Sequence, residues 1–75
     1  MGRAVRMDTD DRAVAAAEYA VGKVPYPAGG LIELEIHTYL EQNLGMNPSS
    51  DESFEIADKA LSVAGIILGV GPESL

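Results

Sequence analysis

Cysteine and tryptophan are absent from the 75 residues of this chain, and histidine and phenylalanine each occur once. The lack of cysteine excludes disulfide bonds and thiolate metal sites. A chain this short has room for a single hydrophobic core and buries only about 60% of its unfolded surface. We therefore expect residues 1–75 to form one small domain, whose stability comes from packing or from a partner.

Basic side chains are also scarce, with five against twelve acidic ones and a net charge of −7. A charge of this sign repels nucleic-acid phosphates and anionic lipid surfaces, so we expect neither direct nucleic-acid binding nor membrane binding. The first residues lack the apolar stretch of a secretory signal, and we therefore expect the protein in the cytoplasm. A hydrophobic content of 47% argues against disorder.

Proline and glycine divide the chain into three segments with helical patterns. The first helix is predicted over residues 9–24, where alanine is frequent and Asp8 or Thr9 can cap the start. Residues 1–7 are predicted to be a flexible tail before it. Residues 25–30 hold two prolines and two glycines and predict a linker, because neither a helix nor a central strand tolerates that composition.

The segment of residues 31–44 fits two patterns. Ile32, Leu34 and Ile36 alternate with charged or polar residues, as in a strand over residues 31–40, whereas Ile32, Ile36 and Leu40 share one helical stripe. The helix accounts for the longer stretch, and Gly45 provides a stop for it. We therefore predict an all-α, three-helix domain; an α+β domain with a strand over residues 31–40 is the alternative.

The third helix is predicted over residues 50–69 and is the most apolar of the three. Ser49 and Glu52 have the spacing of a capping box at its start. Gly69 or Gly71, followed by Pro72, ends it, so residues 70–75 form a C-terminal tail, and an extended arm is one form this tail can take. The predicted core face of this helix comprises Phe54, Ile56, Ala57, Ala60, Leu61, Val63, Ala64, Ile67 and Leu68.

Side chains that carry catalysis or bind metal form no recognisable motif. His37 lies between Glu33 and Glu41 at helical spacing, but one imidazole and two carboxylates on a single helix fall short of the roughly four ligands of a closed metal site. No serine lies in a nucleophile turn, and no glycine-rich segment has the lysine and hydroxyl residue of a phosphate loop. We expect no enzymatic activity, no cofactor and no bound metal.

The longest apolar run, from Ala60 to Val70, is too short to cross a membrane, which takes about 20 residues. Three short helices cannot cover every apolar side chain of the second and third helices, so a second copy or another protein would cover the rest. We therefore predict a non-enzymatic, homo-oligomeric protein that acts by protein–protein interaction or assembly. Tyr19 and Tyr26 are candidate aromatic anchors. The predicted partner interface comprises Leu31, Leu34, Gly65, Ile66, Gly69 and Val70.

The acidic charge supports a second hypothesis. Asp51, Glu52, Glu55 and Asp58 lie in the first half of the third predicted helix, where their carboxylates resemble a row of phosphates. In this alternative, the protein is an acidic inhibitor or regulator that mimics nucleic acid and occupies a basic site on a partner protein.

Overall fold

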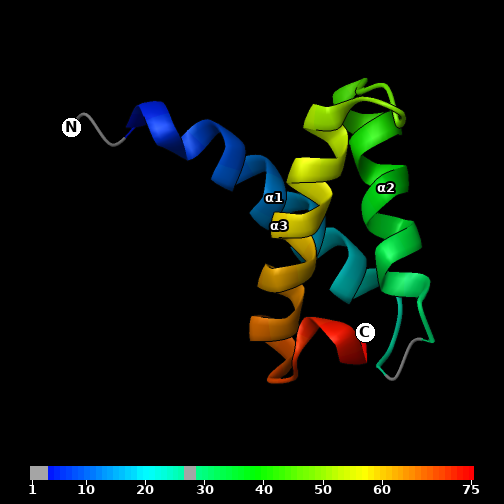
Figure 1. Ribbon diagram of the computed structural model, residues 1–75. Helices are drawn as coiled ribbons and strands as arrows, with labels where there is room; N and C mark the ends of the chain where they lie inside the picture. The colour runs from blue at the N-terminus through cyan, green and yellow to red at the C-terminus, as the bar shows by residue number, and fades with distance from the viewer. Residues whose placement is uncertain (1–3, 27–28) are drawn as a thin grey trace.

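The computed structural model describes residues 4–26 and 29–75, and it contains three α-helices followed by a short 3-10 turn (Figure 1). The helices are α1 (Ala4–Lys23), α2 (Leu31–Leu44) and α3 (Asp51–Leu68), and the 3-10 turn is η1 (Pro72–Ser74). The predicted all-α, three-helix domain is confirmed. No helix in the described part of the chain is both long enough and apolar enough to cross a membrane.

The predicted bounds of the second helix are confirmed, and the strand alternative for residues 31–40 is wrong. Ile32, Ile36 and Leu40 are all fully buried, and their spacing of four residues places them on one side of α2. The described residues contain no strand. The helical stripe prevails because it buries three large side chains against one neighbouring surface.

Helix α1 begins five residues before the predicted start. Asp8 and Thr9, which we expected to cap it, lie inside the helix, so the predicted tail of residues 1–7 is helical from Ala4 onward. Residues 1–3 lie outside the described residues, as do residues 27 and 28 of the predicted linker. The early start has a simple cause, because neither proline nor glycine occurs between Arg3 and Val21.

The ends of α2 and α3 are set by glycines and by one serine. Gly45 and Gly69 follow the two helices in the left-handed conformation, with φ of 66° and 76°, as predicted for helix stops. The N-cap of α3 is Ser50 rather than Ser49, and its hydroxyl accepts a hydrogen bond from the Ser53 N–H over 3.1 Å. Ser49 lies one residue too early, because its N–H donates to the Asn47 side chain over 2.9 Å and is held in the preceding turn.

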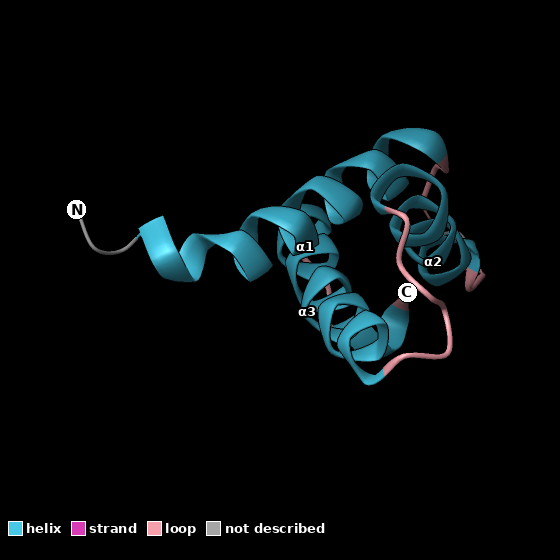
Figure 2. Cartoon of the chain, turned by 90° about the horizontal axis from the view of Figure 1, so that it is seen from above, coloured by secondary structure: helices cyan, strands magenta, loops and turns pink. Residues whose placement is uncertain are grey.

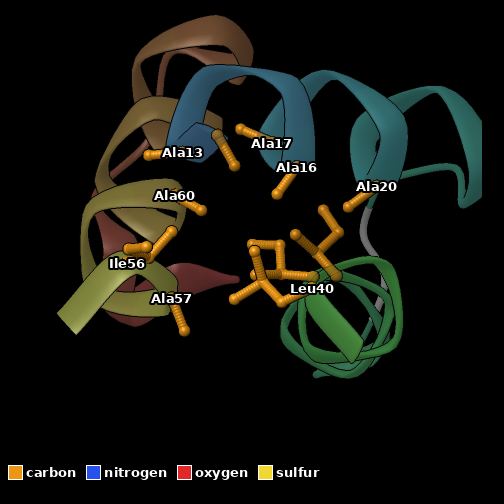
Figure 3. Packing of buried hydrophobic residues seen from close by; sticks show 11 residues of the cluster. Ala13, Ala16, Ala17, Ala20, Leu40, Ile56, Ala57 and Ala60 are labelled. Atoms are coloured by element: carbon orange, nitrogen blue, oxygen red, sulfur yellow. The ribbon is translucent and has the colours of Figure 1, made fainter. Parts of the chain in front are cut away.

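The core is built largely from alanine. Helix α1 packs against both α2 and α3, and its buried alanines face Ala60 of α3 and Leu40 of α2 (Figure 3). Small side chains on this face permit close approach of the helices. The buried apolar residues are Ala13, Ala16, Ala17, Ala20, Ile32, Ile36, Leu40, Ile56, Ala57, Ala60 and Ala64.

The C-terminal tail is folded back onto the domain, so the extended arm considered for residues 70–75 is not what the structure contains. After Gly69 the chain turns, forms η1 and returns towards the start of α2 (Figure 2). The Gly30 N–H donates to the Leu75 carbonyl oxygen over 2.9 Å, and the partly buried Leu75 side chain packs against the core. The tail folds back because Leu75 can bury apolar surface there.

Candidate interaction surface

The predicted interface residues divide between two helices and differ in exposure. Leu31 and Leu34 are exposed on the first turns of α2, with Leu34 at 58%. Ile66, on the last turns of α3, is 78% exposed, which is the highest value among the exposed large apolar residues. Gly69 is also exposed, just beyond the end of α3. These positions are open to a partner.

Gly65 and Val70 do not lie on this open surface. Gly65 is buried and Val70 is partly buried. The cause is the turn at the end of α3, where the Val70 N–H donates to the Gly65 carbonyl oxygen over 2.9 Å and brings the chain back over the helix. Gly65 and Val70, which were predicted as interface residues, are therefore not open to a partner in the way that Ile66 is.

Two residues predicted for the core of α3 lie at the surface instead. Phe54 is 55% exposed and Ile67 is 46% exposed. Figure 1 shows α1 crossing behind the middle of α3, so both ends of α3 extend past α1. The Phe54 ring lies edge-on to the imidazole of His37, with 6.2 Å between ring centroids. The apolar periodicity of α3 predicts that both side chains are buried, but it does not show which parts of the helix surface the other helices cover.

A depression of about 460 Å³ lies between α1 and α3, and we call it the α1/α3 depression. Its α1 wall consists of Ala13 and Val14, and its α3 wall consists of Lys59, Ser62 and Val63. Val14 is itself exposed, and Val63 is partly buried. Sequence reasoning missed this depression, because it depends on how two distant segments cross, which no local pattern encodes.

The first half of α3 carries the acidic residues of the alternative hypothesis. Asp51, Glu52, Glu55 and Asp58 are all exposed. The Glu52 carboxylate accepts a hydrogen bond from the Arg12 guanidinium across 3.2 Å, which links α3 to α1. An exposed ion pair of this kind contributes at most about 1 kcal/mol. The remaining length of α3, from Ala60 to Leu68, has no charged side chain.

Of Glu33, His37 and Glu41, which lie at helical spacing on α2, only Glu33 and His37 come close to each other. The His37 Nε2 atom lies 3.9 Å from the Glu33 carboxylate, and Glu41 is exposed. Within residues 4–26 and 29–75, no group of three or more histidine or carboxylate side chains is arranged to hold a metal ion. These three residues therefore offer one weak ion pair at the surface, between Glu33 and a protonated His37.

An aromatic and cationic cluster joins α1 to α2. The Tyr19 and Tyr39 rings lie 5.0 Å apart, and the Lys23 ammonium donates a hydrogen bond to the Tyr19 hydroxyl over 3.0 Å. This hydrogen bond, together with the charges of Tyr19 and Glu35, raises the pKa of Lys23 above 10.5. Tyr19, a candidate anchor for a partner, is thus engaged within the domain, whereas Tyr26 is exposed.

Comparison with protein families, with curated proteins and with solved structures found no match to this chain. The main features of the candidate surface are the exposed apolar side chains, the α1/α3 depression beside them and the acidic first half of α3. Such an arrangement suits the binding of another polypeptide, because the apolar positions and the depression offer surface that a partner can cover.

Proposed function

We propose that this chain is a non-enzymatic protein that acts by binding other polypeptides, and that its first partner is a second copy of itself. The exposure of Ile66, at 78%, is the observation that carries the proposal. Removal of a branched aliphatic side chain from water is favourable, and Ile66 forgoes most of that gain in a single copy. A partner that covers it supplies the gain.

The distribution of large apolar side chains supports the same function. Among the described residues, only four large apolar side chains are fully buried, namely Ile32, Ile36, Leu40 and Ile56. Seven others are exposed: Val14, Tyr26, Leu31, Leu34, Phe54, Ile66 and Ile67. Because a domain of this size gains little from its own core, association is a direct way to add buried apolar area. We further propose that this takes place in the cytoplasm, without a cofactor and without direct contact with nucleic acid or membrane.

The test is the mass of the protein in solution. Sedimentation velocity from about 1 to about 500 µM should show an oligomer that dissociates on dilution. Ile66→Asp should shift the protein towards the monomer, because it places a charge where apolar surface is buried. Gln42→Glu is the matched control, since it adds the same charge at an exposed position of α2. A monomer at the highest concentration would overturn the proposed self-association.

The exposed carboxylates of Asp51, Glu52, Glu55 and Asp58 favour a second candidate, an acidic inhibitor that occupies the basic site of a nucleic-acid-binding protein. In that case the chain should displace labelled duplex DNA from a basic DNA-binding domain. The displacement should weaken strongly between about 50 and about 500 mM salt, because screening acts on charged contacts. Apolar self-association should persist in high salt. Unchanged DNA binding at low salt would exclude the inhibitor.

A further inference from the structure

The last turns of α3 carry a protruding side chain and, one turn earlier, the wall of the α1/α3 depression. Ile66 protrudes, whereas Ser62 and Val63 line the depression. Residues three and four positions apart lie on the same side of a helix, so the protrusion and the depression share one face. The opposite wall is formed by Ala13 and Val14 of α1, and Lys59 of α3 also lines the depression.

We propose that a second copy of this chain docks on this face, and that Ile66 of each copy enters the α1/α3 depression of the other. The inference rests on the self-association proposed above and specifies its geometry. A two-fold pair requires a surface that is complementary to itself. An aliphatic side chain that protrudes beside a depression lined mainly by aliphatic side chains meets that requirement. Each contact then occurs twice.

The charges on α3 favour one direction for this pairing. Its acidic residues lie between Asp51 and Asp58, and the segment from Ala60 to Leu68 is uncharged. If the two α3 helices run antiparallel and overlap along their uncharged halves, the acidic halves lie at opposite ends of the pair. A parallel pair would place like charges side by side, which is unfavourable for chains that each carry a charge of −7.

The size and lining of the depression fit an aliphatic guest. Its volume of about 460 Å³ accommodates more than one aliphatic side chain. Ile67, which is also exposed, lies four residues after Val63 and therefore beside the same wall. Ser62 is small and exposed, so it allows the second helix to approach closely.

A cross-linking experiment tests the geometry directly, because the chain contains no cysteine. Ser62→Cys places one thiol close to the two-fold axis of the proposed pair, and Ser49→Cys places one in the turn before α3, away from it. Under mild oxidation, Ser62→Cys should form a disulfide-linked dimer at least about tenfold faster than Ser49→Cys. Ile66→Asn added to Ser62→Cys should abolish this advantage. The dissociation constant of the wild-type dimer should be at least about tenfold lower than that of the Ile66→Asn protein.

The outcomes separate the geometry from the proposed function. If the wild-type protein self-associates but Ser62→Cys cross-links no faster than Ser49→Cys, the geometry is wrong and self-association stands. If the wild-type protein stays monomeric throughout, both proposals are wrong. Circular dichroism of each variant checks the fold. Should Ile66→Asn unfold, the comparison of the two cysteine variants still decides the geometry, because both replace exposed serines.

Discussion

The Leu75 carbonyl oxygen and the Gly30 amide are joined by a hydrogen bond of 2.9 Å, which ties the segment after α3 to the residue that precedes α2. The two residues are 45 positions apart in the sequence, and the Leu75 side chain is partly buried against the core at this point. The segment from Gly69 to Leu75 therefore belongs to the packed domain and contributes to its stability.

Leu75→Ala should lower the free energy of unfolding by about 1 kcal/mol, because it removes apolar contacts at a partly buried site. Chemical denaturation followed by circular dichroism measures the change. Ser74→Ala, at the neighbouring exposed position, is the control and should have little effect. Equal stability of the Leu75→Ala and wild-type proteins would show that the segment does not stabilise the domain.

Ser50→Ala should lower the free energy of unfolding by about 1 kcal/mol, because it removes the side-chain cap of α3 and leaves the Ser53 N–H without its partner. Ser49→Ala should change it much less, since Ser49 uses its backbone N–H in the turn. Thermal unfolding of the two variants provides the measurement. A larger loss of stability for Ser49→Ala than for Ser50→Ala would show that Ser49 caps α3, as the sequence predicts.

Two glycine-to-alanine substitutions should change the free energy of unfolding in opposite directions. Gly22 lies in α1 with open space around the position of a Cβ atom, so Gly22→Ala should raise the free energy of unfolding by about 0.5–1 kcal/mol. Gly30 has φ of 89°, so Gly30→Ala should lower it by about 1–2 kcal/mol. Denaturant titration compares both with the wild-type protein. The assignment of Gly30 to a left-handed turn fails if Gly30→Ala is neutral.

Tyr19→Phe should lower the pKa of Lys23, because the hydrogen bond to the Tyr19 hydroxyl is the main cause of its elevation. A raised pKa means that the folded state favours the ammonium form. Its contribution to stability is present below pH 10.5 and is lost as the pH rises through the higher folded value. An NMR titration of the Lys23 side chain in the variant and in the wild-type protein measures the change. An unchanged Lys23 titration in Tyr19→Phe would contradict this cause.

Features that depend on neighbouring residues in the sequence were predictable. The bounds of α2 follow from Ile32, Ile36 and Leu40 at helical spacing, and the stops at Gly45 and Gly69 follow from the left-handed conformation that glycine adopts. In the candidate surface, the exposure of Leu34 and Ile66 also follows from helical spacing. Both lie off the stripe that each helix buries.

Features that depend on the crossing of α1 and α3 were not predictable from these patterns. Phe54 and Ile67 have the periodicity of core residues, but each is about half exposed. The α1/α3 depression has the same origin. Gly65 is buried because the chain reverses after Gly69, where the Val70 N–H donates to the Gly65 carbonyl oxygen.

The alanine face of α1 also affects how the interior becomes ordered. Ala13, Ala16, Ala17 and Ala20 have no side-chain rotamers to lose, so their burial costs only backbone entropy. The same methyl groups expose little apolar surface on unfolding, so the heat-capacity change should be low for a chain of this length, and stability should vary only gradually with temperature.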